Sequence, residues 1–175
     1  MLIALAGLPG TGKTAVAGHL AARLPGIVLD KDRLRACLFP PSEIAYSADQ
    51  DDFVMDVAYR VADQLFRGNR DRYVLIDGRT FTKEHQVADL FRWAGRIAVP
   101  VKVVECVCAD AVAEGRLGRD TAGHGHPAAN RTVALYRALK AQAEPLRVPR
   151  LVLDTGADDL AACVDRALAY VRGAG

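Results

Sequence analysis

Residues 7–14 of the chain read Gly7-Leu8-Pro9-Gly10-Thr11-Gly12-Lys13-Thr14, which matches the pattern G-x-x-x-x-G-K-T. Glycines at these positions allow successive backbone N–H groups to turn toward one anion, so the pattern is typical of a phosphate-holding P-loop. All eight residues are therefore candidate nucleotide contacts. Lys13 is expected to reach the β and γ phosphates, and the Thr14 hydroxyl is expected to bind Mg²⁺.

The residues on both sides of this stretch support the interpretation. Residues 2–6 form a continuous apolar run that predicts a buried strand. After the loop, Val16, Leu20 and Leu24 recur every four residues, as on one face of a helix. A strand, a glycine-rich loop and a helix are the context that a phosphate-binding loop requires, because a helix N-terminus favours an anion. The alternative is a glycine-rich turn that binds nothing.

Length and composition fit a single globular domain over residues 1–175. The formal net charge of +2 does not indicate a protein that coats nucleic acid or a membrane surface. No apolar run reaches the length of a membrane span. The chain enters its first predicted strand without a basic leader, so we expect a cytoplasmic protein.

Short apolar runs alternate with helical patterns along the whole chain. They cover residues 2–6, 27–29, 73–77, 99–107 and 151–153, and they predict five strands. Strands that alternate with helices predict an α/β fold in which a parallel sheet is covered on both faces. Residues 42–52 and 118–129 are expected to be loops, the second of them suited to a mobile lid.

Carboxylates directly follow two of the predicted strands. Asp30 and Asp32 lie just beyond residues 27–29, and Asp77 ends the strand at 73–77. Ligands of open α/β sheets bind outside the carboxyl ends of the strands, so these acids are candidate site residues. The alternative for Asp30 and Asp32 is a polar turn followed by a helix cap.

Together, the P-loop, the motif Asp32-x-x-Arg35, the strand-ending Asp77 and a segment with Arg116 and Arg119 resemble the small P-loop kinases. The similarity is greatest to the group of polynucleotide kinases, zeta toxins and chloramphenicol phosphotransferase, and it covers nearly the whole chain. It implies a three-layer fold with a parallel sheet in the order 2-3-1-4-5, helices on both faces, and a lid at about residues 116–130. It also implies ATP and Mg²⁺ as cofactors.

The resemblance implies the catalytic roles. Asp32 would be the general base that takes the proton of the acceptor hydroxyl, and it is also a candidate Mg²⁺ ligand. Arg116 or Arg119 would close over the transferring phosphate. Charge spreads over the phosphate oxygens in the transition state, and Lys13, Mg²⁺ and such an arginine can stabilise it.

The resemblance also implies the binding roles. Arg35 and Asp77 would contact the acceptor, and Arg79 is a further candidate for this contact. Thr155, after the last strand, would lie near the adenine of ATP. The sequence Asp77-Gly78-Arg79 stands where polynucleotide kinases commonly have Asp-Thr-Asn, which leaves the identity of the acceptor open.

We therefore predict an ATP-dependent kinase that transfers the γ-phosphate to a hydroxyl of a small molecule such as a sugar, a nucleoside or an antibiotic. Residues 36–59 hold no Lys or Arg but five acids, namely Glu43, Asp49, Asp51, Asp52 and Asp56. Beside the acceptor they would repel a polyanion, which disfavours the first alternative, a polynucleotide 5′-hydroxyl kinase. The alternative is that these five acids only stabilise the start of a helix. A second alternative is a nucleotide-binding switch or ATPase, although a base and a lid favour transfer.

Overall fold

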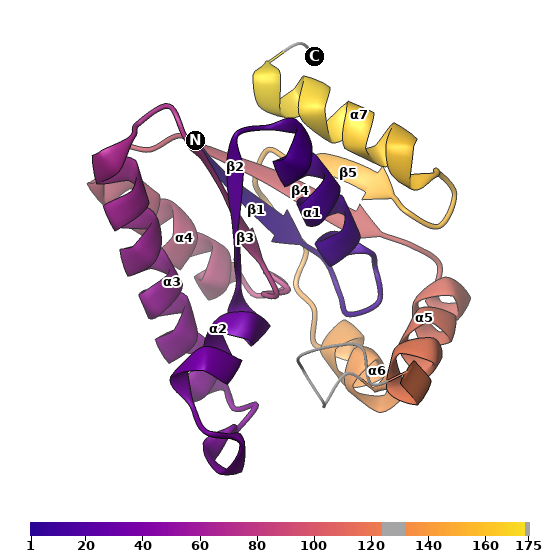
Figure 1. Cartoon of the computed structure of the whole chain (residues 1–175). Helices are drawn as coiled ribbons and strands as arrows, with labels where there is room; N and C mark the ends of the chain where they lie inside the picture. Colours follow the sequence, from indigo (N-terminus) through magenta and orange to yellow (C-terminus); the bar gives the residue numbers. More distant parts are fainter. Residues whose placement is uncertain (124–131, 174–175) are drawn as a thin grey trace.

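A computed structural model describes residues 1–123 and 132–173. Five parallel strands form one sheet in the order β2-β3-β1-β4-β5 (Figure 1). The strands are β1 Leu2–Ala6, β2 Gly26–Asp30, β3 Tyr73–Asp77, β4 Val101–Val107 and β5 Leu151–Asp154. The helices are α1 Lys13–Arg23, α2 Lys31–Leu38, α3 Ala48–Gly68, α4 Glu84–Arg96, α5 Asp110–Gly123, α6 Val133–Ala141 and α7 Leu160–Arg172, and Pro41–Glu43 forms a 3-10 turn. The predicted fold class and strand order are confirmed.

Alternate residues of the central strand β1 serve the two faces of the sheet. Leu2 and Ala4 belong to a core shared with α3 and α4, whereas Ile3 and Leu5 belong to a core shared with α1 and α7. Figure 1 shows these helix pairs on opposite sides of the sheet. Since β1 is held between β3 and β4 and is fully buried, the loop that follows it starts from a fixed point at the carboxyl edge of the sheet.

Helices α5 and α6 form a pair of their own beyond this carboxyl edge (Figure 1). Ala113, Leu117 and Tyr136 make their small core, and the Tyr136 hydroxyl donates to Asp110 at 2.7 Å. The predicted loop over residues 118–129 is wrong at its start, because α5 continues to Gly123. The remainder of the predicted lid, residues 124–130, lies outside the described residues.

Helix α3 starts at Ala48, a little before the start near Asp51 that the sequence suggests. Ser47 caps it by accepting a hydrogen bond from the Gln50 backbone N–H at 3.2 Å, so the expected loop over residues 42–52 ends at Ser47. Asp51 and Asp52 therefore lie on the first turns of a helix. None of the helices described here combines the length and the apolar composition that crossing a bilayer requires.

Candidate active site

The P-loop runs from the end of β1 into the N-terminus of α1. Gly7, Gly10 and Gly12 have φ values of 129°, 78° and 83°, a region that side chains rarely adopt. A Cβ on Gly7 would lie 2.2 Å from the Cys106 carbonyl oxygen, so this position has room only for glycine. Gly12 is the N-cap of α1, which gives the loop the helix-start geometry that favours phosphate.

Two side chains of the P-loop bind the loop's own backbone. Lys13 is buried, and its Nζ donates to the Leu8 carbonyl oxygen at 2.7 Å. The Thr11 hydroxyl donates to the same oxygen at 2.8 Å. Thr14, by contrast, is exposed and lines the cavities on both sides of the loop, as Lys13 does.

The first of these cavities has a volume of about 550 Å³ and lies between the start of α1, Thr155 and the N-terminus of α7. Thr155 is bound to the P-loop, because its hydroxyl donates to the Thr11 carbonyl oxygen at 2.8 Å. Arg116 donates to the Thr155 hydroxyl at 3.0 Å, to the Thr155 carbonyl oxygen at 2.7 Å and to the Gly10 carbonyl oxygen at 3.3 Å. Arg116 thus joins the P-loop to the segment after β5.

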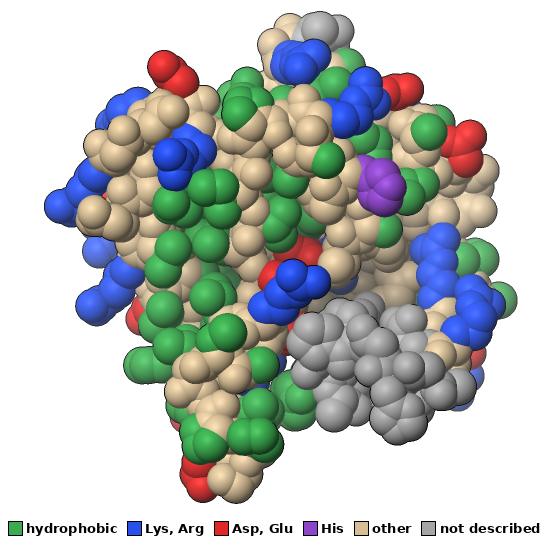
Figure 2. All heavy atoms as spheres, in the orientation of Figure 1, with side chains coloured by type: hydrophobic (Ala, Val, Ile, Leu, Met, Phe, Trp, Pro, Cys, Tyr) green, Lys and Arg blue, Asp and Glu red, His purple; other side chains and the backbone are tan. Residues whose placement is uncertain are grey.

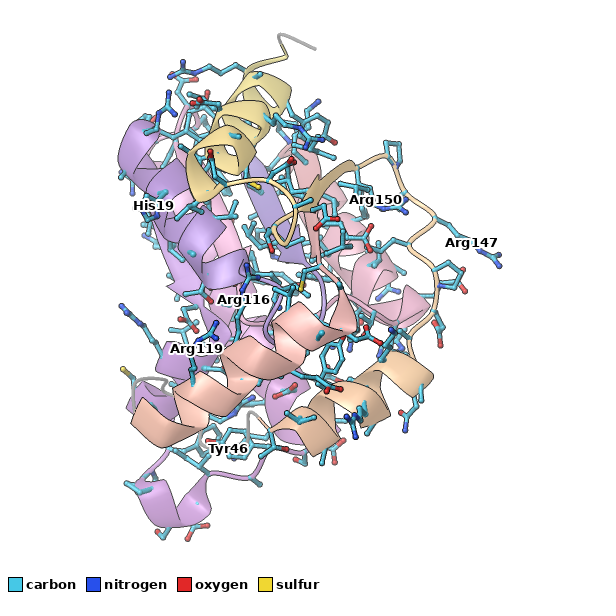
Figure 3. The ribbon with its side chains drawn as sticks, turned by 90° about the vertical axis from the view of Figure 1, so that its right-hand side faces the viewer. His19, Tyr46, Arg116, Arg119, Arg147 and Arg150 are labelled. Atoms are coloured by element: carbon cyan, nitrogen blue, oxygen red, sulfur yellow. The ribbon has the colours of Figure 1, made fainter. Side chains whose placement is uncertain are left out.

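Arg119 lies one turn further along α5 and is exposed. Figure 3 shows that Arg116 and Arg119 project from the side of α5 that faces α1. The two arginines therefore differ in their surroundings: Arg116 is bound to Thr155 and to the Gly10 carbonyl oxygen next to the first cavity, whereas Arg119 is exposed.

The second cavity, the cleft, has a volume of about 350 Å³. Its walls come from the P-loop, the start of α2, the start of α3, residues 78–86, the α6 residues Leu135 and Leu139, and Gln142 at the C-cap of α6. Figure 2 shows acidic and basic side chains next to each other in the hollow between α1 and α2. Because Lys13 and Thr14 line both cavities, the two spaces meet at the P-loop.

Asp30 and Asp32 have different positions at the start of α2. Asp30 is the N-cap, and its Oδ1 accepts hydrogen bonds from the backbone N–H groups of Asp32 at 2.8 Å and Arg33 at 3.2 Å. The helix-cap alternative is therefore correct for Asp30. Both acids line the cleft, and the Oδ1 of Asp32 accepts a hydrogen bond from Arg35 at 2.7 Å.

Basic side chains neutralise the acids of the cleft. Arg35 is 1% exposed and also bonds to Asp51, and Lys31 donates to Asp51 at 2.8 Å. On the next residue of α3, Asp52 accepts a hydrogen bond from Arg79 at 2.6 Å.

These pairs correct an expectation from the sequence. Of the five acids between residues 36 and 59, only Asp51 and Asp52 are among the described residues that line the cleft, and both are paired. The expected repulsion of a phosphate-bearing acceptor therefore loses its basis. Sequence reasoning also missed Lys31 and Tyr46 as cleft residues. The place of Lys31 between two acids in the sequence could have indicated its role in the cleft. Nothing in the sequence indicates the role of Tyr46 (Figure 3), whose ring lies 5.1 Å from the Arg35 guanidinium.

Asp77 ends β3 opposite Asp30 in the register of the sheet and is completely buried. It lies beneath the cleft and is not one of the described residues that line it. Neither of its carboxylate oxygens has a hydrogen-bond partner in the described part of the chain. Burial raises the pKa of the nearby Cys106 thiol to about 12, with the charge of Lys13 opposing the rise and that of Asp77 adding to it.

The fold and the phosphate-binding loop define a P-loop nucleotide-binding protein with a kinase-like fold. The sequence matches the model of the AAA_33 family, described as an AAA domain, over residues 2–146. The chain belongs to this family. Among curated proteins, no sequence matches it significantly.

Several solved structures with a similar fold are kinases. A putative kinase from Chloroflexus aurantiacus has a TM-score of 0.74 at 21% identity, and the match covers 98% of this chain and 96% of that one. A gluconokinase from Sinorhizobium meliloti has a TM-score of 0.71 at 20% identity, with 98% and 91% covered. The APS kinase of Mycobacterium tuberculosis, in complex with AMPPNP and APS, has a TM-score of 0.69 at 18% identity, with 98% and 96% covered. These similarities establish the fold. They do not include a polynucleotide kinase, so the predicted grouping with polynucleotide kinases stays a prediction.

Proposed function

We propose that the protein is an ATP-dependent phosphotransferase that phosphorylates a hydroxyl of a small-molecule acceptor. The observation that carries this proposal is the meeting of two cavities at Lys13 and Thr14. ATP would occupy the cavity beside Thr155, with its γ-phosphate directed across the P-loop. The acceptor would occupy the cleft, where Asp32 is available as a base.

The residues of the cleft suit phosphoryl transfer. Asp32 takes the proton of the acceptor hydroxyl while the hydroxyl oxygen attacks the γ-phosphorus and the bond to ADP breaks. Arg35 fixes the orientation of Asp32 by binding its Oδ1. Lys13 and an arginine of α5 stabilise the charge that spreads over the transferred phosphoryl group.

The oxygen donors near the P-loop fit Mg²⁺, which prefers such ligands. A buried carboxylate without a hydrogen-bond partner is costly unless a cation compensates it, so Asp77 is the expected support of the ion, together with the Thr14 hydroxyl. When bound, Mg²⁺ neutralises charge on the β and γ phosphates. Asp32 is a second candidate ligand, and its Oδ1 is already bonded to Arg35. The described residues contain no cluster of three or more metal-ligating side chains.

The shape of the cleft favours a small acceptor. About 350 Å³ is at the lower end of the range for small-molecule sites, and α6 covers the cleft opposite the P-loop. Lys31, Arg35 and Arg79 neutralise Asp51 and Asp52 in the cleft, so charge repulsion no longer argues against a polynucleotide. The preference for a small acceptor therefore rests on the size of the cleft.

An acceptor screen with γ-labelled ATP tests the proposal directly. Sugars, sugar acids, nucleosides, hydroxyl-bearing antibiotics and 5′-hydroxyl oligonucleotides are incubated with the protein and Mg²⁺, with the Lys13→Ala variant as the blank. We expect label on a small hydroxyl compound. Label only on the oligonucleotide would promote the polynucleotide alternative, and release of phosphate to water alone would favour an ATPase.

A further inference from the structure

We infer that Arg79 makes the cleft selective for an acceptor that carries an anionic group, a carboxylate or a phosphate monoester, in addition to its hydroxyl. The anionic group would take the place of Asp52 as the partner of the Arg79 guanidinium. This inference rests on the proposed function, because it takes the ligand of the cleft to be the acceptor of the phosphoryl group. The binding of an anion at Arg79 does not itself require phosphoryl transfer.

Arg79 is buried with few hydrogen bonds. It follows β3 through Gly78, whose φ of 88° brings the backbone next to α2. The Arg79 side chain is 6% exposed, and its Nη2 donates to Asp52 at 2.6 Å. Its Nε is buried without a hydrogen-bond partner in the described part of the chain. Guanidinium has five N–H donors, and buried donors that stay unsatisfied are costly. Among the described residues, the Nε–H of Arg79 therefore lacks an acceptor oxygen.

The partner of Arg79 can be displaced cheaply. The Asp52 side chain is 57% exposed, so it can turn into water without leaving a buried charge. Asp51, one residue earlier, differs because it is shared by Lys31 and Arg35, and its displacement would leave both cations without it. Of these two carboxylates on α3, Asp52 is the one whose bond can be exchanged for a bond to a ligand.

The position of Arg79 suits an acceptor contact. It lines the cleft together with Lys13 and Asp32, and it also lines a groove of about 480 Å³ between α3 and α4. That groove holds three further arginines and the acids Asp52, Asp56 and Asp89; the arginines are Arg60, Arg92 and Arg96. A planar guanidinium between two cavities can bind a carboxylate or a phosphate through two parallel hydrogen bonds.

A binding experiment tests the anion site without turnover. The P-loop is first saturated with Mg²⁺ and AMPPNP, so that added phosphate cannot bind there. Inorganic phosphate and glycerate are then titrated by calorimetry, with glycerol as the neutral counterpart of glycerate. We expect both anions to bind and glycerol to bind at least tenfold more weakly. Absence of anion binding by the wild-type protein would overturn the inference.

Four variants assign the binding to Arg79. Arg79→Gln should weaken both anions by about 10- to 100-fold, and Arg79→Lys by less, because it keeps the charge and loses the fork. Asp52→Asn removes the internal competitor and should tighten both anions by about three- to tenfold. Asp63→Asn is the matched control, since it removes the same charge from an ion pair with Arg67 on the same helix. The inference would be refuted if Asp52→Asn changed the affinity for the anions no more than Asp63→Asn does. It would also be refuted if Arg79→Gln bound the anions as tightly as the wild-type protein. If Arg79→Gln fails to fold, Asp52→Asn decides.

Matched acceptor pairs separate this inference from the proposed function. Labelled ATP is offered with glycerate or glycerol, glycerol phosphate or glycerol, and gluconate or sorbitol, which distinguishes the carboxylate from the phosphate. We expect at least a tenfold higher kcat/KM for one anionic class and a smaller ratio in Arg79→Gln. Transfer with equal preference for neutral compounds would refute the inference and leave the function standing. Arg79-dependent anion binding without any transfer would refute the function and leave the anion site standing.

Discussion

The proposed nucleotide side and the proposed acceptor side of this site are built from different kinds of contact. On the nucleotide side, Lys13, Thr155 and Arg116 bind mainly backbone carbonyl oxygens. On the acceptor side, side chains bind side chains, as in the pairs Arg35–Asp32 and Arg79–Asp52. The phosphates of a nucleotide are constant, so a fixed backbone shape suffices for them. An acceptor varies between proteins, and exchangeable ion pairs allow its recognition to change without changing the fold.

The largest effect is expected on the nucleotide side. Lys13→Ala removes the cation next to the γ-phosphate, so kcat should fall by about 10⁴-fold or more. The melting temperature without ligand should change little, and the increase that ATP with Mg²⁺ gives the wild-type protein should become smaller. Turnover assays and thermal melts measure both. No stabilisation of the wild-type protein at millimolar ATP would contradict the assignment of the P-loop.

The next effect tests the acceptor side alone. Asp32→Asn should lower kcat by about 10²- to 10⁴-fold while the affinity for ATP stays nearly the same, because the lost group acts on the acceptor. Asp30→Asn is the control: asparagine can still cap α2, so its effect should be small. Steady-state kinetics and equilibrium binding of ATP give the comparison. Equal losses at both positions would show that the base has been assigned to the wrong carboxylate.

Asp77 is buried at the end of β3, and its variant tests the proposed metal site. Asp77→Asn should weaken the apparent affinity for Mg²⁺ by about 10- to 100-fold, because the buried carboxylate that balances the ion is lost. The measurement is turnover as a function of Mg²⁺ concentration at fixed ATP. A variant that loses activity equally at every Mg²⁺ concentration would point to a structural role for this carboxylate.

The two arginines of α5 should separate into two effects. Arg119→Gln is expected to lower kcat by about 10- to 100-fold with little change in ATP affinity, as for a group that acts only in the transition state. Arg116→Gln should instead weaken ATP binding by about tenfold, because it loosens the link between the P-loop and Thr155. The dissociation constant of ATP and kcat, measured for both variants, decide between them. The opposite pattern would exchange the roles of the two arginines.

The smallest effect concerns one hydroxyl. Thr155→Val removes the hydrogen bond to the Thr11 carbonyl oxygen and one acceptor of Arg116. The free energy of unfolding should fall by about 1 kcal/mol, and ATP should bind about fivefold more weakly. Urea unfolding and ATP titration measure both. Ser42→Ala, an exposed hydroxyl outside the cavities, serves as the control.

The sequence predicts the nucleotide side better than the acceptor side because the P-loop is a local pattern. Residues 2–14 contain the strand, the glycines and the helix start that define it. The acids of residues 36–59 were misinterpreted because their partners come from other elements. Lys31 lies 20 residues from Asp51, and Arg79 lies 27 residues from Asp52. The spacing of residues along the sequence gives no indication of such distant pairs.

The end of α5 shows a different limit of the sequence. Its glycines favour a loop from residue 118, yet the helix continues to Gly123. Leu117 packs with Ala113 and Tyr136 in the core between α5 and α6, and this tertiary contact outweighs local propensity. The contact of Arg116 with Thr155, 39 residues away, was equally invisible, so the sequence could not assign separate roles to Arg116 and Arg119.

The hydrogen bond between Thr155 and Thr11 joins residues 144 positions apart, which has a consequence for the order of folding. During synthesis the P-loop leaves the ribosome 144 residues before its wall at Thr155 does. Contacts of such long sequence separation form late, because the chain between them must first be ordered. On the proposed function, the nascent chain would therefore complete its nucleotide pocket only after β5 has been made, and ATP would stabilise only chains that include β5.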